Sequence, residues 1–243
     1  MPNTDLEFRL LGPLEFVRAG TPISVGHGRE RSLLALLLLH ANQVVSADVL
    51  VDRLWGEDPP RTAAKALQTH ISSLRRTLGD GFVLTEGAGW TLAGTDVDAS
   101  RYKSAARMGR DAAAAGDTGQ TVARFEEALA LWRGIPELPD GRRGTSEKTR
   151  WIEGHAALAE DRADALLATG RAAEIIGELE AAVADAPLRE RRWGQLMLAL
   201  YRAGRQGEAL AAYQRARSLL VKELGVDPGP ARRRLSAPPR ARL

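Results

Sequence analysis

Hydrophobic and polar positions alternate over short distances at the start of the chain. The runs LEFRLLG, PLEFV and PISVG are each a few residues long, and turn signals separate them at Gly12-Pro13 and Ala19-Gly20. Short alternating runs between turn signals are typical of half-buried strands. We therefore expect three short β-strands in this part of the chain.

Longer hydrophobic periods then predict three helices. The helices span Arg29–His40, Ala47–Trp55 and Thr62–Leu78. The first is almost wholly apolar, which favours a core helix. Ser46 is a good N-cap for the second, and Pro59-Pro60 ends it. Gly79 is the stop signal of the third helix.

A hairpin is expected directly after the third helix. The segment FVLTEGAGWTL contains two short β runs around Gly87-Ala88-Gly89. Strands, three helices and a terminal hairpin follow one another in the order of a winged helix-turn-helix. Any other small α+β domain with this order of elements is the alternative.

The third helix has two contrasting faces. Leu67, Ile71, Leu74 and Leu78 form one apolar stripe. At 100° per residue, the opposite face carries Thr62, Lys65, Thr69, Ser72, Ser73 and Arg76, with Gln68, His70 and Arg75 on its flanks. No acidic residue occurs between Arg61 and Leu78. A cationic face rich in hydroxyls and amides suits the major groove of DNA, and the alternative is an ordinary solvated face.

Overall charge adds no argument for nucleic acid. The net charge is +3, but residues 1–97 carry nine basic and eleven acidic residues. The tail after Asp227 carries five arginines and no acid. The basicity of the chain therefore comes from the tail, and only the third helix gives a local argument for DNA.

The remainder of the chain is rich in alanine and has an internal period. A shift of 34 residues aligns Ala159–Pro187 with Trp193–Val221, and it superposes Gly170 on Gly204. The spacing resembles that of tetratricopeptide helix pairs. An earlier pair follows a helix at about Ser100–Ala115, and the segment Gly134–Arg150 interrupts the period. Stacked helix pairs predict a surface for binding macromolecules, and a plain helical bundle is the alternative.

Composition excludes several classes of protein. A length of 243 residues favours two domains, and the absence of cysteine excludes disulfide scaffolds, thiolate zinc sites and iron–sulfur clusters. The start MPNTDLEF has no signal-peptide pattern. The apolar run Leu33–Leu39 is far shorter than the ~20 residues that span a bilayer. We expect a soluble, cytoplasmic protein that does not bind membranes.

No catalytic or metal-binding pattern is present in the sequence. The histidines, His27, His40, His70 and His155, do not pair at metal-ligand spacing. Gly26-His27-Gly28 lacks the third glycine of a dinucleotide loop, and no GxxxxGK[ST] or nucleophile elbow occurs. We therefore expect no enzyme activity, no metal and no cofactor.

Several longer motifs resemble one family over nearly the whole chain. They are LLALLLLHANQVVSADVLVDRLWGEDPP, ALQTHISSLRRTLG, GAGWTL, VDASRY, ALALWRGIP, PLRERRWGQLMLALYRAGRQGEALAAYQRARSLL and ELGVDPGP. The chain resembles the SARP family, the Streptomyces antibiotic regulatory proteins. In that family an OmpR-type winged helix precedes a bacterial transcriptional activator domain (BTAD) of tetratricopeptide-like helix pairs.

The resemblance implies a mainly α fold with small β content. It implies a winged helix-turn-helix DNA-binding domain over residues 1–97, an all-α tetratricopeptide-like repeat domain over 98–230 and a basic tail over 231–243. The function implied is that of a transcriptional activator that binds promoter direct repeats, as a homodimer on DNA, for a secondary-metabolite gene cluster. It would recruit RNA polymerase through the sigma factor or the C-terminal domain of the alpha subunit, in the cytoplasm at the nucleoid.

Candidate site residues follow from the third helix and from the resemblance. The DNA-binding set is Arg61, Thr62, Lys65, Ala66, Gln68, Thr69, His70, Ser72, Ser73, Arg75, Arg76, Gly87 and Gly89. The polymerase-contact set, at the end of the second helix and in the loop that follows, is Trp55, Glu57 and Asp58. The wing carries Glu86, where the family commonly has an arginine.

A second hypothesis belongs to another class of protein. The helical repeats could form a protein-interaction scaffold whose winged helix does not bind DNA. A footprint on the promoter of a neighbouring biosynthetic cluster would distinguish this scaffold from an activator.

Overall fold

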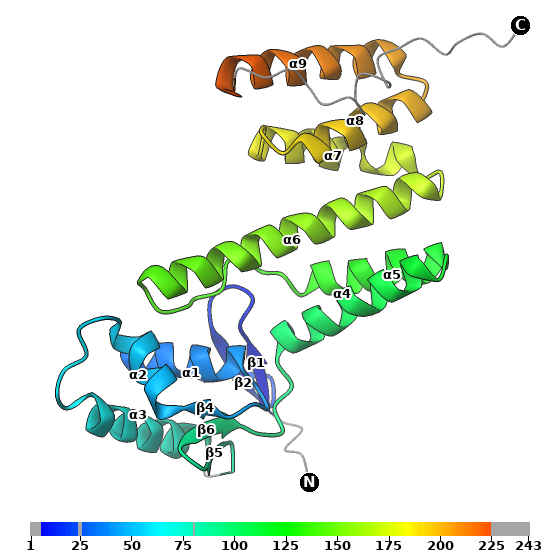
Figure 1. Ribbon diagram of the computed structural model, residues 1–243. Coiled ribbons are helices and arrows are strands. Elements are labelled where there is room, and N and C mark those ends of the chain that lie inside the picture. The colour runs from blue at the N-terminus through cyan, green and yellow to red at the C-terminus, as the bar shows by residue number, and fades with distance from the viewer. Residues whose placement is uncertain (1–5, 24–25, 80, 225–243) are drawn as a thin grey trace, which may run out of the picture. The chain divides into compact units, whose positions relative to one another are not determined.

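The computed structural model describes residues 6–23, 26–79 and 81–224 (Figure 1). The fold is mainly α with small β content, as predicted, and its strands form two three-stranded sheets. By contacts the chain divides into two compact units. The first comprises Met1–Met108 with Glu126–Ala156, and the second comprises Gly109–Phe125 with Ala157–Leu243. This division does not coincide with the domain boundary predicted at residue 97, which stays a prediction.

The first unit begins with an antiparallel sheet of three strands. They are β1 (Leu6–Arg9), β2 (Glu15–Arg18) and β3 (Thr21–Pro22), in the order β1-β2-β3. Phe8 pairs with Phe16, and their rings stack with centroids 4.9 Å apart in the core. The first two predicted strands are confirmed. The third predicted run, PISVG, contributes only Pro22 to β3, and its Ser24 and Val25 lie outside the described residues.

Three helices follow within one residue of their predicted limits. They are α1 (Arg29–Leu39), α2 (Ala47–Trp55) and α3 (Ala63–Leu78). Residues Leu33–Leu38 of α1 are all buried, which confirms a core helix. The Ser46 hydroxyl caps α2 by accepting from the Val49 amide at 3.4 Å.

The second sheet completes the winged helix. Strands β4 (Val45–Ser46), β5 (Val83–Glu86) and β6 (Gly89–Leu92) lie in the order β4-β6-β5. The predicted hairpin is therefore confirmed, and β6 joins it to the short strand that precedes α2.

From Asp98 to Leu224 the described residues are mainly helical, as the 34-residue period predicts. The helices are α4 (Asp98–Ala114), α5 (Thr118–Ala130), α6 (Arg142–Ala168), α7 (Ile176–Asp185), α8 (Glu190–Arg202) and α9 (Gln206–Leu224), with a 3₁₀ turn at Ala172–Ile175 before α7. Gly116, Gly170 and Gly204 each follow a helix with positive φ. After each glycine, the next amide donates to the carbonyl five residues back, as in a Schellman motif.

The segment Gly134–Arg150, which interrupts the 34-residue period in the sequence, is only partly irregular. Helix α6 begins within it, at Arg142. Only the stretch before it is irregular. Gly144 permits this start, because a Cβ there would collide with the Pro139 carbonyl.

The second unit has a core of its own. Leu166, Leu179, Trp193, Leu196 and Leu200 belong to one cluster of buried side chains drawn from α6, α7 and α8. Among the described residues, no helix is long and apolar enough to cross a membrane.

Candidate DNA-binding surface

Helix α3 presents one buried and one exposed face. The predicted stripe of Leu67, Ile71, Leu74 and Leu78 is at most 2% exposed. On the other face the exposed residues include Thr62, Lys65, Gln68, Thr69, Ser72 and Arg76, whereas Ala66, His70, Ser73 and Arg75 are half-buried. The structure therefore brings most of the predicted DNA-binding residues onto one solvent-facing surface. Arg61, just before the helix, is exposed as well.

The hydroxyls on this face bond to their own helix in this structure. Thr69 Oγ1 donates to the Lys65 carbonyl at 3.0 Å, and Ser72 Oγ donates to the Gln68 carbonyl at 2.9 Å. Each oxygen keeps lone pairs that can accept, and each hydroxyl can rotate toward a new acceptor. The face therefore offers donors and acceptors to base edges and a lysine and an arginine to phosphates.

The two adjacent arginines near the end of α3 lie in different surroundings. Arg75 Nε donates to the Val83 carbonyl at 2.9 Å, and its Nη2 donates to Thr85 Oγ1 at 2.7 Å. Arg75 therefore fastens the hairpin to the helix. Arg76 is exposed and is the better placed of the two for a phosphate contact.

Of the two candidate glycines of the hairpin, one is exposed and the other is buried. Gly87 is exposed at the turn, with φ of 57°. Gly89 is buried in β6, where a Cβ would collide with the Val45 carbonyl. Gly89 therefore allows the close packing of β6 on β4, and its predicted role in DNA binding stays a prediction. Glu86, beside the turn, is exposed and adds a negative charge there.

Trp55 is held in place by residues from two other helices. The Arg29 guanidinium lies 5.4 Å from the centre of the indole ring, and the His70 ring stacks at 6.5 Å. His70 and Trp55 therefore support each other, and their predicted contacts with DNA and polymerase stay predictions. No sequence pattern indicates this stack, because its members are far apart along the chain. Glu57 and Asp58, in the loop that follows, are exposed.

The end of α3 has a capping residue that no sequence pattern indicates. Arg18 Nη2 donates to the Leu78 carbonyl at 3.0 Å. The last carbonyls of a helix lack partners within the helix, so this bond fixes the C-terminus of α3 to strand β2.

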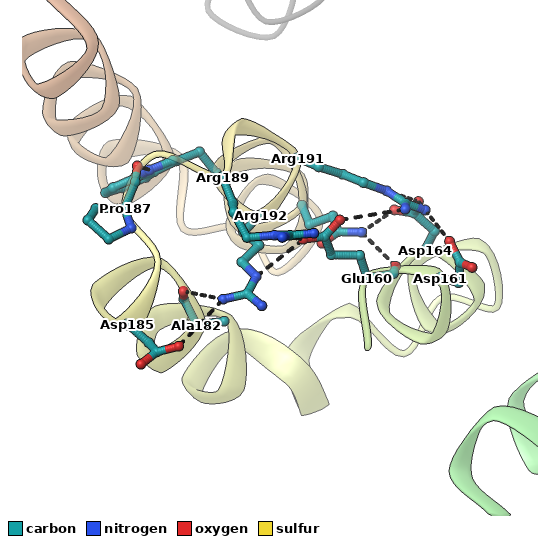
Figure 2. Close-up of polar contacts among 11 residues, drawn as sticks. Glu160, Asp161, Asp164, Ala182, Asp185, Pro187, Arg189, Arg191 and Arg192 are labelled. Carbon is teal, nitrogen blue, oxygen red and sulfur yellow. Dashed lines mark hydrogen bonds and ion pairs between the residues drawn. The ribbon is translucent and has the colours of Figure 1, made fainter. Parts of the chain in front are cut away.

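In the second unit, the motif PLRERRWGQ forms a charged network (Figure 2). The Glu160 carboxylate is buried, and it accepts from Arg189 Nε at 2.8 Å and Arg192 Nε at 3.3 Å. Arg191 Nη2 lies 2.7 Å from both Asp161 and Asp164. The network therefore joins the α6 side chains to the start of α8.

No metal centre is indicated by the described side chains. No group of three or more His, Asp or Glu residues in the described ranges is arranged to hold an ion.

Comparisons with known proteins agree with this architecture. Residues 97–238 match the bacterial transcriptional activator domain, and residues 21–88 match a family described as "Transcriptional regulatory protein, C terminal". The regulatory protein DnrI of Streptomyces peucetius is 34% identical, with 92% of this chain and 88% of that protein covered. The chain belongs to the SARP family of transcriptional regulators.

Other members of the SARP family are longer. The regulatory protein AfsR of Streptomyces coelicolor is 40% identical over 93% of this chain, but the match spans 23% of AfsR. A solved structure of EmbR from Mycobacterium tuberculosis, in complex with a low-affinity phosphopeptide, superposes with a TM-score of 0.87 at 36% identity. It covers 95% of this chain and 64% of the EmbR chain. The chain thus spans less than two thirds of the length of several relatives. The names of these relatives describe them as regulatory proteins, and that of EmbR as a transcriptional one.

Proposed function

We propose that this SARP-family regulator is a sequence-specific activator that binds direct repeats at a promoter and recruits RNA polymerase. One observation carries the DNA-binding part. Helix α3 exposes Lys65, Thr69, Ser72 and Arg76 on a face without any acidic residue, in a chain whose first 97 residues are otherwise slightly acidic. Such a face can contact phosphates and base edges together.

The contacts divide by chemistry. Arg61, Lys65 and Arg76 are exposed cations for phosphates, whereas Gln68, Thr69 and Ser72 are exposed groups that can read bases. Ser73 is half-buried and lies at the edge of this surface. Two chains on adjacent repeats would form the dimer that we propose on DNA.

The polymerase contact that we propose is the loop after α2. Glu57 and Asp58 are exposed there, and Pro59-Pro60 restricts the backbone that follows. DNA phosphates would repel these carboxylates, so a basic surface on polymerase is the better partner. That surface would belong to the sigma factor or to the C-terminal domain of the alpha subunit.

The biological setting that we propose follows from membership of the SARP family. We place the protein in the cytoplasm at the nucleoid, where it would activate a secondary-metabolite gene cluster. The name of DnrI as a regulatory protein of Streptomyces is in keeping with this role. Residues 1–97 would supply the DNA contacts, and the helix pairs of 98–230 would supply contacts between proteins.

A footprinting experiment tests this function. The purified chain is added to the promoter of a neighbouring biosynthetic cluster, and the variant Lys65→Glu is the matched control. We expect protection over two direct repeats with the unaltered chain and none with the variant. If the unaltered chain protects no DNA and selects no duplex from a random-sequence library, the scaffold hypothesis is the better one.

A further inference from the structure

The corner between β1 and β2 obtains its hydrogen bonds from residues much later in the chain. Its residues are 10–14. The Asp98 carboxylate, 2% exposed, accepts from the amides of Leu10 at 2.7 Å and Leu11 at 3.0 Å. Asp98 also accepts from the Ala99 amide at 2.7 Å. One buried carboxylate therefore fixes the first half of the corner to the start of α4.

The segment 133–137 fixes the other half. Arg133 donates its amide to the Leu11 carbonyl at 2.9 Å and its Nη2 to the Pro13 carbonyl at 3.2 Å. The Glu137 amide donates to the Gly12 carbonyl at 3.3 Å. Gly12 has φ of +133°, and a Cβ there would lie 3.0 Å from Arg133 Cβ. The two backbones therefore approach so closely that this position needs glycine.

Helix α1 takes part in the same arrangement through Arg31. Its Nε and Nη2 bind the Glu137 carboxylate at 2.7 and 2.8 Å, and Nη2 also donates to the Leu14 carbonyl at 2.5 Å. Glu137 in turn accepts from the Leu14 amide at 3.3 Å. The Arg31 guanidinium lowers the pKa of Glu137, so the pair is ionised at neutral pH.

The other end of β2 reaches the DNA-reading helix. Strand β2 runs from Glu15, next to the corner, to Arg18, which caps the last carbonyl of α3. Helix α1, which carries Arg31, packs directly on α3. The corner is therefore connected to α3 by two routes, one through a strand of four residues and one through a core helix.

We propose that the segment 133–137, which belongs to the activator part of the chain, is a positioning element for DNA readout. This inference rests on the proposed function. Glu137 and Arg31 hold the corner, and the corner holds β2 and α1 against α3. Neither side chain lies on the exposed face of α3. The unit that reads DNA therefore extends beyond residue 97 and includes Asp98 and the segment 133–137.

The test uses the full chain with the substitutions Glu137→Gln and Arg31→Gln, singly and together. Glu174→Gln is the matched control, because it removes an exposed bidentate partner of Arg171 in the second unit. The probes are duplexes selected from a random-sequence library by the unaltered chain. Affinity is measured over a salt series well below the unfolding temperature, and amide hydrogen exchange is measured in the last turn of α3.

We expect Glu137→Gln to weaken binding about three- to tenfold, as for the loss of one net hydrogen bond. The salt slope should stay unchanged, because no phosphate contact is lost. Amide hydrogen exchange in the last turn of α3 should become faster. The double variant should bind DNA no more weakly than the weaker of the two single variants. Glu174→Gln should change neither the affinity nor the exchange.

Two results separate the possible failures. If Glu137→Gln lowers the unfolding temperature but leaves affinity and α3 exchange as in Glu174→Gln, the pair only stabilises the corner and the inference is wrong. If the unaltered chain selects no duplex, the proposed function fails. In that case faster α3 exchange in Glu137→Gln still supports the positioning role, and unchanged exchange overturns it.

Discussion

Arg75 and Arg76 are adjacent in the sequence, but Arg75 is half-buried and bonded to the hairpin, whereas Arg76 is exposed. We predict that Arg76→Ala weakens binding to all duplexes about equally and lowers the salt slope by about one, because one phosphate contact is lost. The measurement is affinity against salt concentration for two unrelated duplexes. Arg107→Ala, which removes an exposed arginine of α4, is the control and should leave the slope unchanged. An unchanged slope in Arg76→Ala would mean that this face of α3 does not meet DNA.

His40 gives a prediction about pH. It lies half-buried at the end of α1, and its Nε2 is buried without a hydrogen-bond partner. Burial lowers its pKa first, and the positive charges of Arg53 and Lys103 lower it further, against a smaller opposing effect of Glu147. The unfolded chain therefore takes up this proton more readily than the folded chain. His40 costs no stability above about pH 6.5, and stability falls as the pH drops below that value.

We therefore predict that His40→Gln loses less stability than the unaltered chain between neutral and mildly acidic pH. Urea unfolding at several pH values measures this difference. His27→Gln, at an exposed position, is the matched control and should behave like the unaltered chain. If the stability of the His40 and His27 variants depends equally on pH, His40 is not the source of the loss of stability at mildly acidic pH.

At the scale of elements, the turns between helix pairs allow a comparison of two glycines. Gly204 follows α8 with φ of +78°, whereas Gly207 is the second residue of α9 and has open space around it. We predict that Gly204→Ala destabilises the chain by about 1 kcal/mol, because alanine is strained at positive φ. Gly207→Ala should stabilise it by about 0.5–1 kcal/mol, because alanine favours the helix. Urea unfolding measures the change in the free energy of unfolding for both variants. Changes of the same sign would contradict the Schellman motif at Gly204.

The loop after α2 carries the prediction on activation. Replacing Glu57 and Asp58 with alanine should keep or slightly strengthen DNA binding, because two charges that repel phosphates are removed. Activated transcription should fall. A gel-shift titration and a reconstituted transcription assay measure the two effects. The double variant Asp111→Ala/Glu180→Ala changes the net charge equally at exposed positions in the helical repeats and should leave both unchanged.

A parallel loss of binding and activation in the Glu57/Asp58 variant would make the loop a DNA or folding element. The recruitment hypothesis would then fail, because it requires binding to survive when activation is lost.

Elements with local signals could be predicted from the sequence. The apolar period of α3, the Ser46 cap and the turn glycines of the helix pairs each act within a few residues. The stack of Arg29, Trp55 and His70 could not be predicted, because its partners are brought together only by the packing of three helices. The Arg31–Glu137 pair joins residues 106 positions apart, and its members look like ordinary surface charges in the sequence. The burial of Gly89 likewise follows from a strand pairing with β4 that no local pattern shows.

At the scale of the whole molecule, the division into compact units changes how the two parts of the chain are understood. Sequence composition shifts at about residue 98, where the Ala-rich helices begin. Contacts instead place Asp98–Met108 and Glu126–Ala156 with the winged helix. Composition reports which kind of secondary structure a segment forms, whereas contacts report what it packs against. A change in composition is therefore a poor guide to the limits of a folding unit here.

A substitution in the charged network of the second unit can test the proposed contacts between chains separately from the proposed DNA contacts. Glu160 is 5% exposed, accepts from Arg189 and Arg192, and lies 3.6 Å from Arg191 Nη1, so Glu160→Gln leaves these arginines without their buried anion. We predict a loss of stability near the low end of the roughly 3–5 kcal/mol seen when a buried ion pair is broken, because Arg189 is partly solvated and Arg192 keeps its bond to the Ala182 carbonyl. Glu178→Gln, which removes an exposed partner of Arg162, is the control and should cost about 0.5 kcal/mol or less.

The same substitution should act differently on one DNA repeat and on two. Binding of Glu160→Gln to a duplex with one repeat should stay near that of the unaltered chain, because the network touches none of the proposed DNA contacts. Cooperative binding to a duplex with two repeats should fall, because we assign contacts between chains to the helix pairs. Titrations of both duplexes with the two variants measure the difference. If cooperativity survives in a Glu160→Gln chain whose helix pairs are measurably destabilised, the contact between chains on DNA belongs to the winged helix instead.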